Sequence, residues 1–149
     1  MSVQTPIDMA AAMVQRQSPH HLEHIAATEP ERIWISYPLS DDSVKDGFRD
    51  LTFLQHAKAV NAMAWHIESA IGKSTTFETI QYIGLPDMRY HIVLLAAIKT
   101  GHKVLFCSHF NGPNFNEILC DATECNILLH SEGVEIMVDP PVAFKAHED

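Results

Sequence analysis

Strand-like and helix-like segments alternate between positions 79 and 130, and this alternation constrains the fold more than any other feature of the sequence. Three apolar runs read as strands: TIQYIG at Thr79–Gly84, KVLFC at Lys103–Cys107 and NILLH at Asn126–His130. Helical patterns separate these runs; Asp87 caps the first, and the second covers Asn114–Glu124. Parallel strands need such crossovers, which are right-handed and place helices over a sheet. The pattern therefore predicts an α/β fold with a short parallel sheet.

The two crossover helices are expected to face the sheet in different ways. The segment Ile92–Ile98 is apolar on nearly every side, which predicts a helix covered on both sides by other elements. The helix over Asn114–Glu124 carries its apolar residues at helical spacing, which predicts that one face packs on the sheet. That face comprises Phe115, Ile118, Leu119 and Ala122.

An N-terminal helix and an edge strand are expected before the parallel sheet. Ser18 can cap a helix with Pro19 in its first position, and the helix then covers His20–Ala27. The run RIWISY at Arg32–Tyr37 has the two-residue period of a strand and is followed by Pro38.

Leu51–Gly72 has the clearest helical pattern in the sequence. Thr52 and Gln55 have the spacing of a capping box, and Gly72 can close the last turn in a left-handed conformation. An apolar stripe runs along the helix at steps of four and three residues: Phe53, Ala57, Val60, Ala64, Ile67 and Ile71.

Length and composition predict one globular domain. The chain has 149 residues, 46% of them apolar and 19% charged. We expect a flexible N-terminus over 1–17, the folded portion over 18–138 and a polar tail over 139–149. Val134–Val138 is a candidate fourth strand, and Pro140 and Pro141 then end regular structure.

Charge and cysteine usage limit the partners and the compartment. The net charge is −9, and the ten Lys and Arg residues are scattered, which argues against nucleic-acid binding. No apolar run approaches the ~18 residues of a membrane span. Cys107, Cys120 and Cys125 are odd in number and contain no CxxC pair, which favours a reducing compartment. We therefore expect a cytosolic protein that does not bind a membrane.

Two motifs in the N-terminal half resemble binding sites but are incomplete. Residues Ile71–Thr75 contain the GKS of a phosphate-binding loop, yet Ile67 stands where its first glycine belongs, and the motif follows a helix. A helix cap with a solvated Lys73 is the simpler interpretation. His20, His21 and His24 include two imidazoles one turn apart, but no further zinc ligand is evident, which favours an exposed helix face.

Other chemical candidates lie at the ends of the predicted parallel strands. Cys107, followed by Ser108 and His109, could form a nucleophilic site where open α/β sheets bind ligands, although no orienting group is identifiable. After the first strand, Gly84 stands alone where a dinucleotide fold has GxGxxG. Asp87 and Arg89 could pair there or contact a ligand, and helix capping by Asp87 is the simpler interpretation.

Several segments match the sequence patterns of one known group of enzymes. DLTFLQHAKAVNAMAWHI at Asp50–Ile67 resembles the opening of adenylate-forming enzymes: acyl-CoA synthetases, nonribosomal-peptide adenylation domains and luciferases. YIGLPDMRYHIVLLAAIKTGHKVLFCSHFN at Tyr82–Asn111 and LCDATECNILLH at Leu119–His130 resemble fungal nonribosomal-peptide-synthetase-like proteins and carboxylic acid reductases. Ala27–Ser40 and Gly47–Phe53 also fit this group, so the resemblance covers roughly residues 22–130. It implies a Rossmann-like three-layer fragment with three main helices, an N-terminal helix and an edge strand.

The resemblance also implies a function that the chain lacks the motifs to perform. Family members use ATP and magnesium to convert a carboxylic acid into an acyl-adenylate. They depend on a YTSGTTG-like phosphate loop, an adenine-binding segment, a TGD aspartate and a C-terminal lysine, none of which occurs in this sequence. We therefore expect a truncated N-terminal segment from fungal secondary metabolism that is inactive alone and has no catalytic, cofactor-binding or metal residue.

A sheet that lacks its next strands should expose an edge. We expect self-association, or the remainder of a synthetase, to cover it. Two alternatives stay open: a non-catalytic scaffold or regulator of a full-length synthetase, and a small enzyme that uses Cys107 and His109.

Overall fold

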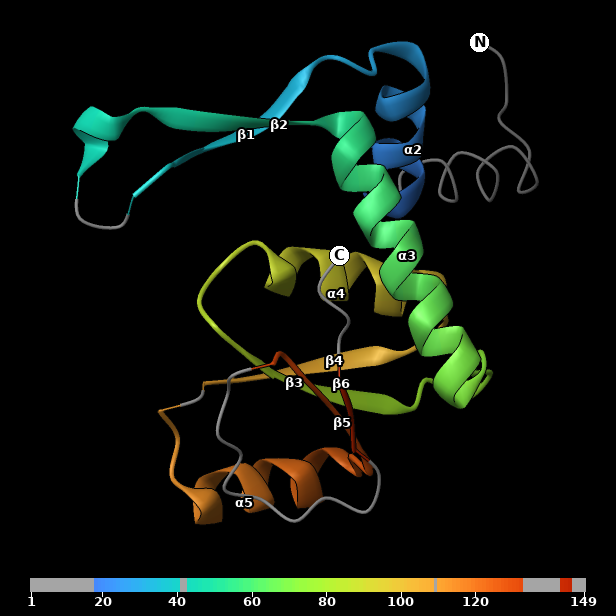
Figure 1. The fold of residues 1–149 in the computed structure, drawn as a ribbon. Coiled ribbons are helices and arrows are strands. Elements are labelled where there is room, and N and C mark those ends of the chain that lie inside the picture. Colours follow the sequence, from blue (N-terminus) through green and yellow to red (C-terminus); the bar gives the residue numbers. More distant parts are fainter. Residues whose placement is uncertain (1–17, 41–42, 109, 133–142, 146–149) are drawn as a thin grey trace, which may run out of the picture. The chain divides into compact units, whose positions relative to one another are not determined.

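The computed structural model describes residues 18–40, 43–108, 110–132 and 143–145 (Figure 1). The chain divides into two compact units, residues 1–59 and 60–149, and each is described by itself. The expected flexible terminus and the candidate strand Val134–Val138 lie outside the described residues.

The first unit contains a helix and an antiparallel hairpin. Helix α2 (Ser18–Thr28) confirms the predicted N-terminal helix, and β1 (Ile33–Pro38) confirms the predicted strand. After a short 3-10 helix, η1 (Val44–Asp46), strand β2 (Phe48–Thr52) pairs antiparallel with β1. Leu51, predicted to open a helix, lies in β2 opposite Ile35. The sequence FRDLT has little strand pattern of its own, so main-chain pairing with β1 decides its conformation.

The long helix α3 (Phe53–Ile71) begins as its capping box predicts. The Thr52 N–H donates to Gln55 Oε1 at 2.9 Å, and the Gln55 N–H donates to Thr52 Oγ1 at 3.2 Å. Gly72 follows the helix with a positive φ, and its N–H donates to the Glu68 carbonyl. The predicted apolar stripe is buried along its middle, at Ala57, Val60, Ala64 and Ile67.

The second unit contains the predicted parallel sheet, with the strand order β4-β3-β5-β6. The sequence correctly predicts the strands β3 (Thr79–Gly84), β4 (Lys103–Ser108) and β5 (Ile127–His130) to within a residue. It also predicts the intervening helices α4 (Arg89–Lys99) and α5 (Pro113–Thr123). The short strand β6 (Ala143–Lys145) pairs parallel with β5 inside the expected polar tail, where no strand is predicted.

Helices cover both faces of this sheet, which confirms the three-layer α/β architecture (Figure 1). On one face, residues of α4 and the second half of α3 pack on the central strands, forming a core of Ala64, Ile67, Ile80, Tyr82, Val93, Ala96 and Leu129. On the other face, Leu119 of α5 packs on Ile83, Cys107 and Leu128. Every residue of β3 is buried, as expected for a central strand between two helical layers.

Helix α5 does not use the apolar face that its sequence predicts. Phe115 and Ile118 are 53% and 63% exposed, and Ala122 is also exposed, so only Leu119 of the expected set packs inward. The inward face instead includes Asn116, Cys120 and Thr123, whose polar atoms are satisfied by hydrogen bonds. Internal hydrogen bonding lets these polar residues face the core.

Helix α4 is also more exposed than its composition predicts, because Ile98 is 42% exposed while Val93, Leu95, Ala96 and Ala97 are buried.

Across the described part of the chain, no helix combines the length and the hydropathy that a membrane crossing requires.

Candidate functional site at the carboxyl edge of the parallel sheet

The carboxyl ends of β3, β4 and β5 meet at one edge of the sheet, where open α/β folds bind ligands. Gly84 ends β3 opposite Ser108 of β4, and His130 ends β5 opposite Ile83 of β3. Strand pairing thus brings together the segments that follow β3, β4 and β5. This edge is the candidate functional site.

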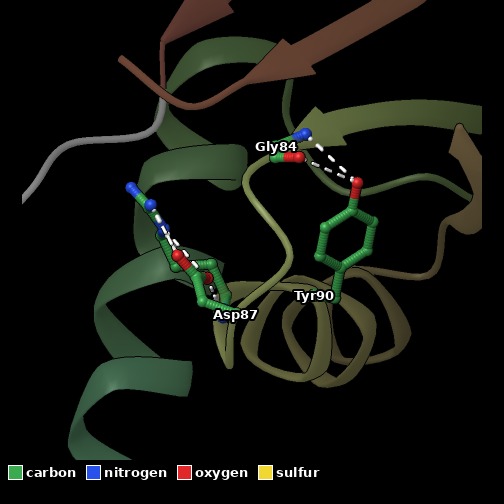
Figure 2. A network of polar contacts seen from close by, with 4 residues as sticks. Gly84, Asp87 and Tyr90 are labelled. Atoms are coloured by element: carbon green, nitrogen blue, oxygen red, sulfur yellow. Dashed lines mark hydrogen bonds and ion pairs between the residues drawn. The ribbon is translucent and has the colours of Figure 1, made fainter. Parts of the chain in front are cut away.

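Tyr90, from the first turn of α4, joins the ends of β3 and β4. Its hydroxyl accepts the N–H of Gly84 at 3.3 Å and lies 3.1 Å and 3.0 Å from the carbonyl oxygens of Gly84 and Cys107, to which it can donate its proton. Figure 2 shows the Tyr90 hydroxyl directed at the main chain of Gly84. One side chain therefore satisfies main-chain groups where two strands end.

Tyr82 fills the space beneath this turn. Its ring packs edge-on against the rings of Tyr90 and Phe106, with centroids 4.7 Å and 6.4 Å away. A Cβ on Gly84 would lie only 2.2 Å from Tyr82 Oη, so the position requires glycine for space. The hydroxyls of Tyr82 and Ser131 are buried and make no hydrogen bond of normal geometry.

Burial raises the pKa of Tyr82 to about 12, against a smaller lowering by the Arg89 guanidinium. The phenol is therefore neutral at physiological pH.

Asp87 and Arg89 form a compact unit in the turn after β3. Asp87 Oδ1 accepts the N–H of Arg89 at 2.9 Å, in the manner of the helix cap that the sequence predicts. The two carboxylate oxygens also accept hydrogen bonds from Arg89 Nε, and Arg89 Nη2 lies 2.6 Å from Asp87 Oδ2 (Figure 2). The predicted pairing of these residues is confirmed.

The turn after β4 is also held by its own polar groups. Ser108 Oγ accepts the N–H of Phe110, and the Asn111 side-chain amide donates to Asn116 Oδ1 at 3.2 Å. After β5, the Ser131 N–H donates to the Ile83 carbonyl and extends the pairing with β3.

Cys107 lies on β4 but faces the core instead of the open edge. Its side chain is 2% exposed, and its Sγ accepts a hydrogen bond from Gln81 Nε2 at 3.1 Å. Burial raises the pKa of the Cys107 thiol, which opposes formation of a nucleophilic thiolate. Ser108 points to the exposed side, and His109 lies outside the described residues.

The GKS segment forms the helix cap and turn that its simpler interpretation predicts. Lys73 pairs with Glu68 at 3.6 Å on the surface. Ser74 Oγ accepts the N–H of Glu78 at 2.9 Å, and the Ser74 N–H donates to the Thr100 carbonyl. These contacts connect the end of α3 to the start of β3 and to the end of α4.

The histidine cluster lies on α2 in the first unit. His20, His21 and His24 are exposed, and His20 Nδ1 lies 3.7 Å from Glu23 Oε2. Within the described ranges, no three His, Cys, Asp or Glu side chains are arranged to hold a metal ion.

The carboxyl edge combines a neutral phenol, a buried hydroxyl and a paired carboxylate and guanidinium. The Asp87–Arg89 pair holds the turn after β3, the Tyr82 and Ser131 hydroxyls are buried, and these groups form no nucleophile–base pair. The sequence pattern points to Gly84, Asp87 and Arg89 at this edge but not to Tyr82, Tyr90 or Ser131. The two tyrosines flanking one turn were a usable signal, because a buried tyrosine generally needs a partner for its hydroxyl.

No family model matches the chain. Curated proteins do match it, two fungal proteins among them. The chain is 33% identical over 138 residues to a carboxylic acid reductase of Neurospora crassa, a match that covers 86% of this chain and 13% of the reductase. It is 30% identical over 118 residues to an isocyanide synthase–NRPS hybrid of Aspergillus fumigatus, covering 78% of this chain and 8% of the hybrid. The chain thus spans a small part of much longer relatives.

Solved structures share its fold at low sequence identity. The Klebsiella oxytoca protein NpsA in complex with 3-hydroxyanthranilyl-AMSN superposes with a TM-score of 0.69 at 12% identity, over 86% of this chain and 24% of NpsA. The NpsA N-terminal subdomain gives 0.67 at 13% identity, over 86% and 31% of the two chains. A fatty acid AMP ligase from Legionella pneumophila gives 0.63 at 11% identity, over 76% and 19%.

The segments quoted from the sequence and these comparisons agree on the same group of proteins. Sequence similarity to the two fungal proteins and the fold shared with NpsA together support the identification of this chain as an N-terminal adenylate-forming fragment.

Proposed function

We propose that this chain supplies the N-terminal α/β segment of a cytosolic protein that activates carboxylic acids with ATP in fungal secondary metabolism. The 33% identity over 138 residues to the Neurospora carboxylic acid reductase carries this proposal. The parallel sheet and its tyrosine-supported carboxyl edge would serve as a scaffold on which the remaining strands and the nucleotide-binding loops assemble.

The 149-residue polypeptide by itself does not form an acyl-adenylate under this proposal. Stabilising a phosphoryl transition state requires main-chain donors and cations that converge on the phosphates. The sequence contains no glycine- and threonine-rich phosphate loop. Arg89, near the candidate edge, is paired with Asp87, and Lys73, in the GKS turn, is paired with Glu68.

Exchange of radiolabelled pyrophosphate into ATP tests this point directly. We expect no exchange above background from the purified 149-residue chain with a panel of aliphatic and aromatic acids, and no shift of Tm with millimolar ATP and Mg²⁺. The intact reductase serves as the positive control. Saturable exchange by the short chain would contradict the proposal.

A scaffold role is a second candidate, and the exposed residues of the second unit favour it. Strand β4 has a described neighbour on one side only, and Phe106 on it is 41% exposed. Docking of a complete synthetase there would pair its main chain with β4. Specific co-purification with an intact synthetase, lost when Val104 or Phe106 is replaced by proline, would support this scaffold role. It would argue against a role in which the chain acts only as a segment of the synthetase polypeptide.

A further inference from the structure

Helix α5 ends in a Schellman motif that places two cysteines next to each other. Glu124 adopts the left-handed conformation, with φ 53° and ψ 37°. The Glu124 N–H donates to the Asp121 carbonyl at 3.3 Å, and the Cys125 N–H donates to the Cys120 carbonyl at 2.8 Å. In this motif the side chains of the two outer residues often pack against each other. Here those residues are Cys120 and Cys125, and an interaction with the Cys125 thiol contributes to the raised pKa of Cys120.

The same motif lies beside a third thiol. Gln81 Oε1 accepts a hydrogen bond from the Cys120 thiol at 3.2 Å, while Gln81 Nε2 donates to Cys107. The Cys125 thiol donates to the Thr79 carbonyl at 3.2 Å. Burial, followed by the proximity of Cys125 and then Cys107, raises the pKa of Cys120 to about 11. Three thiols from different elements therefore gather between α5 and the sheet, and all are reduced.

The surroundings distinguish one pair within this trio. Gln81 binds both Cys107 and Cys120 through opposite ends of its amide, which separates these two sulfurs. Cys120 and Cys125 are instead joined by a main-chain hydrogen bond across a short loop. Cys120 is only half-buried, whereas Cys107 is buried within the sheet. A reagent from solution therefore reaches Cys120 first.

We propose that Cys120 and Cys125 form a paired-thiol modification site that closes to an intramolecular disulfide by exchange with a small-molecule disulfide. The small fraction of Cys120 that is deprotonated attacks one sulfur of the reagent and releases one reagent thiolate, so the step is slow at neutral pH. The Cys125 sulfur then attacks the mixed disulfide at the Cys120 sulfur and releases the second. The two protons of the cysteine thiols pass to the two released thiolates, and the reagent disulfide is reduced by two electrons as the protein dithiol is oxidised.

Peptide mapping tests this proposal because the three cysteines separate on cleavage after glutamate. Cys107 falls in Thr79–Glu117, Cys120 in Ile118–Glu124 and Cys125 in Cys125–Glu132. The reduced full chain is incubated with excess oxidised glutathione at pH 8.5, quenched with acid and digested. We expect Ile118–Glu124 linked to Cys125–Glu132, two hydrogen masses lighter than the sum of the peptides. Closure should accelerate by about tenfold per pH unit between pH 7 and 9, because the thiolate is the nucleophile.

Variants separate the pair from a general effect of oxidation. Cys107→Ala should leave closure unchanged within about twofold, because Cys107 takes no part in the exchange. Glu124→Gly retains the left-handed cap and should close at least as fast as the wild type. Glu124→Val disfavours that conformation and should close roughly tenfold more slowly. A crosslink that includes Cys107, a stable glutathione adduct on Cys120, or no reaction in the folded chain would each overturn the proposal.

Discussion

At the scale of single residues, two tyrosines in contact with each other have opposite hydrogen-bonding environments. The Tyr90 hydroxyl bonds to the main chain at the ends of β3 and β4, whereas the Tyr82 hydroxyl is buried without a hydrogen bond of normal geometry. A buried polar group without a partner opposes folding, and a well-bonded one supports it. The same chemical change at the two positions should therefore have different effects.

We predict that Tyr90→Phe lowers the free energy of unfolding by about 1–2 kcal/mol, because it removes the bonds to Gly84 and Cys107. Tyr82→Phe should change it by less than about 0.5 kcal/mol or increase it slightly. Urea unfolding followed by circular dichroism measures both variants. Equal losses for the two variants would show that the Tyr82 hydroxyl has a favourable contact in the folded chain.

A buried histidine gives the second unit a pH-dependent stability. His102 is 4% exposed, and its Nδ1 lies 2.9 Å from Thr100 Oγ1. Burial lowers the pKa of His102 below its usual value, against a smaller opposing influence of Glu78. The unfolded chain therefore binds a proton at a higher pH than the folded chain does.

We predict that the free energy of unfolding is greatest above the ordinary histidine pKa of about 6.5 and decreases as the pH falls from there toward the lowered pKa of His102. His91, whose pKa is also lowered by burial, adds to the same trend. Urea unfolding between pH 5 and 8 should give a shallower pH dependence for His102→Gln than for the wild type. If His102→Gln leaves the pH dependence of the unfolding free energy unchanged, groups other than His102 are responsible for it.

At the scale of secondary-structure elements, α5 shows where an apolar pattern and actual burial differ. Leu119 packs on the sheet, and the neighbouring Ile118 is 63% exposed. We predict that Leu119→Ala costs about 1–3 kcal/mol of unfolding free energy, while Ile118→Ala costs less than about 0.5 kcal/mol. Thermal or urea unfolding distinguishes the two. A large loss for Ile118→Ala would mean that α5 packs with its predicted apolar face inward.

The elements that the sequence predicts well are those with a strong local signal. The continuous apolar runs of β3, β4 and β5, and the capping box of α3, appear in the structure within one or two residues of their predicted bounds. Strands β2 and β6 were missed because pairing with β1 and β5, and not their own composition, determines them. The predicted inward face of α5 is wrong because Asn116 and Cys120 face the sheet side through hydrogen bonds to residues across a turn or distant in sequence, which the local pattern does not show.

In the candidate site, too, the residues with a local sequence signal are predicted and those positioned by contacts in the folded chain are not. Gly84 and Asp87 were identified because turns and helix caps have local signatures. Tyr82 and Tyr90 were missed because the contact between β3 and α4 exists only in the folded chain.

At the scale of the whole molecule, this chain spans 13% of the length of its Neurospora relative, so its function is best tested in that context. The measurement is ATP–pyrophosphate exchange by the Neurospora reductase in which the matching segment is replaced by the aligned part of this chain, 86% of its length. A second chimera carrying Gly84→Ala, which forces a Cβ against Tyr82, serves as the control with a disrupted edge. The account predicts acid-dependent exchange within about tenfold of the parent reductase for the first chimera, and a further loss for the second. A soluble, folded first chimera without exchange would contradict the claim that this chain is an adenylation-domain segment.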